Sequence, residues 1–131
     1  VTLAEITGIA KIWQASDQKR LGTPIFTGEH TNRGLDIETI IARTWKPKEV
    51  APPIATPHIG GPVAYWISYQ RQCQNVLHDL EPALDGLDPE EIIFPHFLSG
   101  PLDALQRLDF IRFHLDRHRV QIENLLSEQL S

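Results

Sequence analysis

Two histidines near the end of the chain could do chemistry together. His114 and His118 are four residues apart, inside an apolar stripe that also contains Ile111, Leu115 and Ile122. On an α-helix this spacing places two side chains one turn apart on the same face. Two imidazoles in that position can supply nitrogen ligands to one divalent metal ion. The alternative is that both rings are structural, either hydrogen-bonded or partly exposed.

A metal centre built on this pair needs a further donor, because zinc and its neighbours usually take three or four protein ligands. His30 is the favoured candidate, since the irregular segment after the first helix can reach the mouth of a bundle. His58, which follows a proline, is a less favoured one. His78 is expected near the carboxyl end of a helix, where a positive charge is favourable, so a solvated role is preferred for it.

Other reactive residue types are expected to be structural. Cys73 lies in an apolar stripe without a basic neighbour on its face, which predicts an inert buried thiol. Trp66 falls at helical spacing and is expected in the core, while Arg117 is expected to pair with a carboxylate. The sequence contains no nucleophile elbow, phosphate loop or dinucleotide fingerprint. No catalytic residue is therefore assigned.

A more specific pattern surrounds the histidine pair. The run PHFLSGPLDALQ at residues 95–106 is followed by HLDRH at 114–118 and by Gln121 and Ile122. This combination resembles the closing signature of the DinB/YfiT-like superfamily, whose members are four-helix bundles found in bacteria. The resemblance implies that His114 and His118 bind a metal ion such as zinc or nickel, and that His96 anchors its loop by a hydrogen bond to the bundle.

The chain departs from the family pattern in two places. The family's third histidine lies on its second helix, where this chain reads Ile6-Thr7-Gly8-Ile9. The family's first helix would precede Val1, and the sequence contains no Met. We therefore expect either a processed or fragmentary chain, or a bundle packed differently through a partner chain, with a homodimer as one form of it.

Two functions follow from these observations. The first is a metal-dependent hydrolase or a transferase of a low-molecular-weight thiol, because the family that the chain resembles includes bacillithiol transferases and mycothiol-dependent isomerases. Its partner would be a small molecule or such a thiol. The second is a non-catalytic helical module for binding or assembly, which has kept the scaffold and lost the complete metal site.

The elements that must position the histidines are predicted to be helices. Apolar residues at helical spacing predict a helix over residues 2–21, and a longer amphipathic face predicts another over 60–80, with Pro62 in its first turn. Prolines and glycines break the chain between 23 and 61, where only a short helix around 36–43 is expected. Such a long crossing is often functional or wraps across packed helices.

The last helix is predicted to run to about Ser127. Ser99 or Gly100 is expected to cap it, with Pro101 in its first turn and Asp103 favouring the helix dipole. Residues 81–97 are predicted to form a loop whose apolar residues pack against the bundle, namely Ile92, Ile93 and Phe94. No strand pattern is evident, so the predicted class is all-α, a helical bundle with long crossover loops.

Composition sets the outer limits of function. The 131 residues, 41% of them hydrophobic, fit a single domain that spans the whole chain. The single Cys73 excludes an internal disulfide and a thiolate zinc site and favours a reducing, cytoplasmic compartment. A formal net charge of −5 opposes binding to nucleic acid. The sequence contains neither a membrane-spanning run nor a signal peptide pattern, so no membrane partner is expected.

Overall fold

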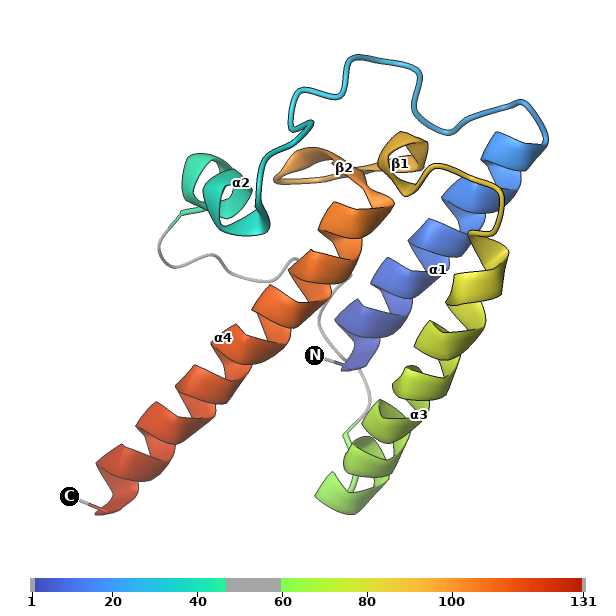
Figure 1. Cartoon of the computed structure of the whole chain (residues 1–131). Coiled ribbons are helices and arrows are strands. Elements are labelled where there is room, and N and C mark those ends of the chain that lie inside the picture. The colour runs from blue at the N-terminus through green and yellow to red at the C-terminus, as the bar shows by residue number, and fades with distance from the viewer. Residues whose placement is uncertain (1, 47–59, 131) are drawn as a thin grey trace.

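The computed structural model describes residues 2–46 and 60–130, with side chains from residue 6 onward. In chain order the described elements are α1 (Thr2–Arg20), α2 (Ile37–Thr44), α3 (Val63–Ala83), a 3-10 turn at Pro89–Glu91, β1 (Ile93–His96), β2 (Gly100–Asp103) and α4 (Ala104–Leu130). Figure 1 shows the three long helices, with α1 lying between α3 and α4. The predicted helical class is therefore confirmed, and a small sheet is added to it.

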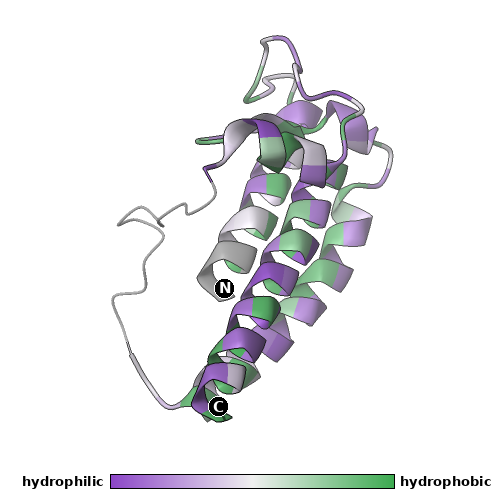
Figure 2. Ribbon diagram, turned by 90° about the vertical axis from the view of Figure 1, so that its left-hand side faces the viewer, coloured by the Kyte–Doolittle hydropathy of each residue, from purple (hydrophilic) through white to green (hydrophobic). Residues whose placement is uncertain are grey.

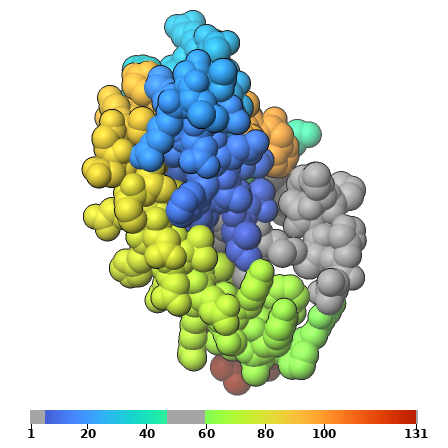
Figure 3. Space-filling view, turned by 90° about the vertical axis from the view of Figure 1, so that its right-hand side faces the viewer, coloured from blue at the N-terminus to red at the C-terminus, as the bar shows by residue number. Residues whose placement is uncertain are grey.

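The main core lies where α1 contacts both other long helices. Ile9, Ile12 and Ala15 of α1 are buried against Leu80 of α3 and Ile111 of α4. Figure 3 looks onto the face where α1 and α3 lie side by side. At their ends these two helices are joined by Arg20, whose guanidinium donates to the carbonyl oxygens of Ala83 and Asp85 at 2.6 Å each.

A second, smaller core holds α2 against α4. Ile37, Ile40 and Leu102 are fully buried there, with Phe110 and Phe113 packed around them. The helix begins after Asp36, whose carboxylate accepts a hydrogen bond from the Thr39 amide at 2.7 Å. This N-cap satisfies one of the free amide groups at the helix start. The short helix predicted around residues 36–43 is thus confirmed.

The segment before α4 differs from the prediction. Residues 93–96 and 100–103 form an antiparallel hairpin in which Phe94 pairs with Leu102 and His96 with Gly100. The predicted helix start at Ser99 or Gly100 is therefore wrong, because Gly100 has a φ of +78° and Pro101 lies within a strand. The helix begins at Ala104 instead. Asp103 caps it by accepting from the Gln106 amide, while the Gln106 side chain accepts from the Asp103 amide.

The remaining helix boundaries agree with the sequence to within a few residues. The helix α1 ends at Arg20, and α3 begins one residue after Pro62, which serves as its N-cap, and continues through Pro82. The helix α4 runs three residues beyond the predicted end. Hydrophobic residues recur along α4 down to its carboxyl end (Figure 2). Within the described ranges, no helix combines the length and apolar character that a membrane crossing requires.

Candidate functional site

The histidine pair lies at the middle of α4, where the helix leaves the packed body. His114 and His118 are both partly buried, and their rings meet edge to face with centroids 4.6 Å apart. Their Nε2 atoms are 3.1 Å apart. The predicted placement on one face, one turn apart, is therefore confirmed.

Both imidazoles are held in the neutral form. Burial, followed by the neighbouring His118 and Arg117, lowers the pKa of His114 to about 4. Burial is also the largest cause that lowers the pKa of His118. A neutral imidazole has one nitrogen with a free lone pair, which can accept a hydrogen bond or bind a metal ion. At neutral pH the pair can do either.

The separation of the two nitrogens fits both possibilities. One Nε2–H can donate to the other Nε2 at 3.1 Å. Two nitrogens bound to one tetrahedral zinc ion, each about 2.05 Å from it, lie about 3.3 Å apart. The observed distance is close to that value. The pair is therefore spaced as two ligands of a single ion are spaced.

An aromatic wall lies beside the pair. Phe110 stacks on the His114 ring at 5.9 Å between centroids, and Trp45 lies 5.8 Å from Phe110. The Trp45 indole is fixed by donating to Ser99 Oγ at 2.8 Å. Arg117 lies over the Trp45 ring at 5.8 Å, so a cation–π contact takes the place of the predicted carboxylate partner.

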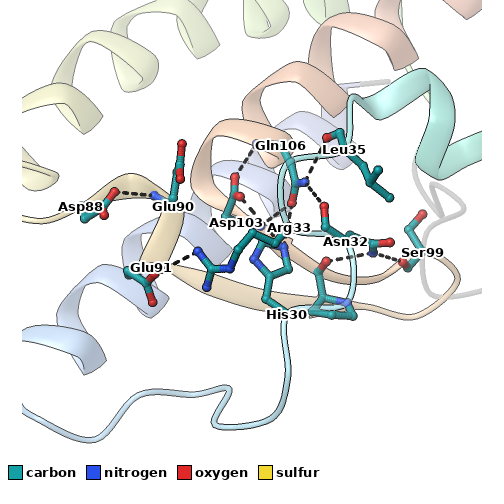
Figure 4. A network of polar contacts seen from close by, with 11 residues as sticks. His30, Asn32, Arg33, Leu35, Asp88, Glu90, Glu91, Ser99, Asp103 and Gln106 are labelled. Carbon is teal, nitrogen blue, oxygen red and sulfur yellow. Dashed lines mark hydrogen bonds and ion pairs between the residues drawn. The ribbon is translucent and has the colours of Figure 1, made fainter.

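His30 lies at a different place, near the start of α4. Its Nε2 donates to Gln106 Oε1 at 3.0 Å and lies 3.9 Å from Asp103 Oδ2 (Figure 4). Gln106 precedes His114 by eight residues, which is about 12 Å along a helix. The structure thus brings His114 and His118 together and does not bring His30 to them.

Gln106 is the centre of a polar network that the sequence did not reveal. Its side-chain amide donates to the carbonyl oxygens of Asn32 and Leu35 at 2.7 and 3.1 Å. Asn32 in turn donates to the carbonyl oxygens of Ser99 and Pro101. Figure 4 shows these groups converging from the loop before α2 and from the hairpin. The spacing of Asp103 and Gln106, that of a capping box, was the available signal.

His96 anchors its turn as expected, but through amides of the turn itself and not through the predicted hydrogen bond to the bundle. Its Nδ1 accepts hydrogen bonds from the amides of Leu98 and Ser99 at 3.1 and 3.2 Å. Burial lowers the pKa of His96 to about 3, and the positive charges of Arg107 and Lys11 lower it further. His96 is therefore neutral, with Nδ1 as the acceptor. His58 lies outside the described residues, and His78 is exposed on α3, in agreement with a solvated role.

A separate cavity of about 780 Å³ opens between α3 and α4, on a face of α4 that neither His114 nor His118 lines. Its walls combine apolar and basic side chains, including Cys73, Leu77, Leu108, Leu115, Arg71 and Arg119. Cys73 is buried and directs its thiol to the Tyr69 carbonyl oxygen at 3.6 Å. This placement agrees with the buried thiol that the sequence predicts, whereas Trp66 is only partly buried.

No third ligand candidate joins the histidine pair in the part of the chain that the structure describes, where no group of three His, Cys, Asp or Glu side chains could hold an ion. No family model, curated protein or solved structure matches the chain.

Proposed function

We propose that the protein binds a divalent metal ion, zinc or nickel, through His114 and His118. The observation that carries the proposal is the 3.1 Å separation of two Nε2 atoms, which is close to the spacing of two ligands on one ion. Burial supports it, because both imidazoles have lowered pKa values and neutral histidine is the form that binds metals.

The surroundings of the pair would favour a ligand at this position. Phe110 stacks on His114 and limits its rotation, and Trp45 and His96 extend the aromatic wall. Phe110 thus covers one face of the His114 ring, and we propose that a ligand approaches the pair from elsewhere. Arg117, held over Trp45, supplies a positive charge at the rim. An anionic ligand such as a thiolate would be attracted by it.

The reaction that we propose is hydrolysis or the transfer of a low-molecular-weight thiol, as in the DinB/YfiT-like proteins that the sequence resembles. A bound divalent ion lowers the pKa of a water or a thiol and so supplies a nucleophile near neutral pH. Two protein ligands alone give weak binding. We therefore propose that the substrate or water completes the coordination.

A metal titration tests this proposal. Isothermal titration with Zn²⁺ or Ni²⁺ should show one binding event per chain, which His114→Ala and His118→Ala each abolish. His78→Ala is the matched control, because His78 is exposed on α3 and outside the pair. If both pair variants bind the ion as the unmodified protein does, His114 and His118 are structural and the proposal is wrong.

A non-catalytic assembly module is the second candidate, and one observation favours it. Large apolar side chains on α3 and on the end of α4 are exposed, including Val63, Ile67, Val76, Ile122, Leu125 and Leu126. Stripes of this kind are normally covered in a stable helical protein. We propose a second copy of the chain as the covering partner. Sedimentation analysis tests it, since a monomer at every concentration would contradict the assembly function.

A further inference from the structure

We propose that Arg107 and Lys11 form a binding site for a small oxyanion, a carboxylate or a phosphate, at the junction of α1, β1 and α4. The two side chains come from different helices, and each lies over the ring of Phe94 in β1. The Lys11 Nζ lies 5.0 Å from the centroid of that ring, and the Arg107 Cζ lies 5.7 Å from it.

Arg107 is the main element of this site because two of its guanidinium nitrogens are buried without a hydrogen-bond partner among the described residues. The residue is 5% exposed, and its Nε and Nη2 atoms have no hydrogen-bond partner. Among the side chains described from residue 6 onward, no carboxylate lies within ion-pair distance of Arg107 or of Lys11. A buried charge without hydrogen bonds is costly, and a cation–π contact compensates only part of that cost.

Other arginines of the chain differ from Arg107 in this respect. Three exposed arginines each contact a carboxylate, in the pairs Arg33 with Glu91, Arg112 with Glu38 and Asp109, and Arg119 with Asp116 and Glu123. The distances in these pairs range from 2.5 to 3.0 Å. Among the side chains that the structure describes, carboxylates thus pair with these exposed arginines, and none pairs with the buried Arg107.

An oxyanion is the ligand class that the free donors of Arg107 fit. The planar guanidinium presents N–H groups in a fork that matches two oxygens of a carboxylate or phosphate. The Nε and Nη2 atoms without partners are neighbours in that fork. Lys11 adds a second positive charge and is only partly buried, so it connects the site to solvent.

The electrostatics of the neighbouring groups agree with this arrangement. Burial and the charge of Arg107 lower the pKa of Lys11, and burial lowers that of Arg107 to about 10. Both charges also act on His96. Positive potential therefore accumulates at one place in the described structure. A bound anion would relieve it, and its binding does not depend on a metal ion at His114 and His118.

Binding of inorganic phosphate and of succinate to the full chain tests the proposal. Isothermal titration and thermal unfolding would be measured at constant ionic strength, with chloride as the balancing salt. We expect saturable binding of at least one anion and a rise in melting temperature that follows mass action. Phosphate alone would indicate a tetrahedral ligand, and succinate alone a planar one.

Three variants make the result specific. Arg107→Met, which keeps the bulk of the side chain, should weaken anion affinity about tenfold or more, because it removes a charged fork of donors. Lys11→Met should weaken it by a smaller factor. Arg119→Met is the matched control, because Arg119 is exposed and pairs with Asp116 and Glu123 on the same helix. The anion affinity of this variant should equal that of the unmodified protein.

Several outcomes would overturn the proposal. One is the absence of saturable binding of either anion to the unmodified protein. Another is an equal rise in melting temperature for the unmodified protein and Arg107→Met, which would be the general stabilising effect of such salts. If Arg107→Met does not fold, Lys11→Met decides, and an unchanged affinity in that variant would contradict the site. Metal titration of the same samples reports separately on the histidine pair.

Discussion

At its amino end α4 is held by buried polar contacts and by both hydrophobic clusters, whereas from Arg119 onward each described residue of the same helix is exposed. Ala104, Gln106, Arg107 and Ile111 are buried, while Ile122 is 58% exposed. The histidine pair lies at the boundary between these two halves. The packed amino half of α4 fixes the backbone before the pair, and the exposed carboxyl half leaves space for a ligand after it.

The contrast shows that the apolar pattern of a helix does not by itself determine burial. The stripe that begins at Ile111 continues at helical spacing through Ile122 and Leu126. Ile111 and Leu115 pack in the main core, whereas Ile122 and Leu126 are exposed. The amino end is also fixed by buried hydrogen bonds, such as those of Gln106 with Asn32 and Leu35. Four predictions test how large this difference is.

The largest effect is expected at Gln106. Replacing it with Leu removes the acceptor of His30 and the donor to Asn32 and Leu35. Several buried polar groups then lose their partners, at a cost of about 3 kcal/mol or more in the free energy of unfolding. Chemical denaturation measures it. Gln129→Leu, at the exposed end of the same helix, should change stability by less than about 0.5 kcal/mol.

Two isoleucine substitutions compare how tightly the amino and carboxyl halves of α4 are packed. Ile111 is 7% exposed, so Ile111→Ala should lower the free energy of unfolding by about 2–4 kcal/mol through lost burial and a cavity. Ile122→Ala should cost well under 1 kcal/mol, because its side chain remains largely in water. Equal costs in urea denaturation would mean that the distal half of α4 is covered in solution.

The packed half also predicts a dependence of stability on pH. The pKa of His96 is about 3 in the folded chain, against an ordinary value of 6.5. Between these values the unfolded chain binds a proton that the folded chain does not. Stability attributable to His96 is therefore complete above pH 6.5 and is lost as the pH falls toward 3.

His96→Asn isolates this contribution from that of the carboxylates. An asparagine oxygen can take the place of Nδ1 as acceptor for the Leu98 and Ser99 amides, and it does not titrate. Unfolding measured between pH 7 and pH 3.5 should give a flatter stability curve for this variant. Parallel curves for the two proteins would show that His96 is not held neutral.

The sequence predicted the helices because their apolar residues recur over many turns, as in residues 2–20 of α1. It missed the hairpin because its strands have four residues each, too few to show a period. Pro101 was predicted in the first turn of the helix because proline is favoured there. The positive φ of Gly100 and the pairing with β1 determined a different structure.

In the candidate site too, contacts between residues close in sequence could be predicted, and contacts between distant residues could not. The pairing of His114 with His118 is local, so their spacing was enough to predict it. The partner of His30 lies 76 residues away, and no local pattern fixes such a contact. No sequence pattern marks Arg107 as buried, and arginine is seldom buried without a partner. Its burial depends on how α1, β1 and α4 meet, which only the tertiary structure shows.

The smallest effect is expected for the double variant Leu125→Gln and Leu126→Gln. These side chains are 60% and 54% exposed, so an isolated chain should lose less than about 0.5 kcal/mol of stability. The measurement is thermal unfolding over a hundredfold range of protein concentration. If the melting temperature of the variant falls further below that of the unmodified protein as the concentration rises, a second copy covers this end of α4 in the unmodified protein. The difference in exposure between the two halves of α4 would then exist only in the single chain and would disappear in the assembly.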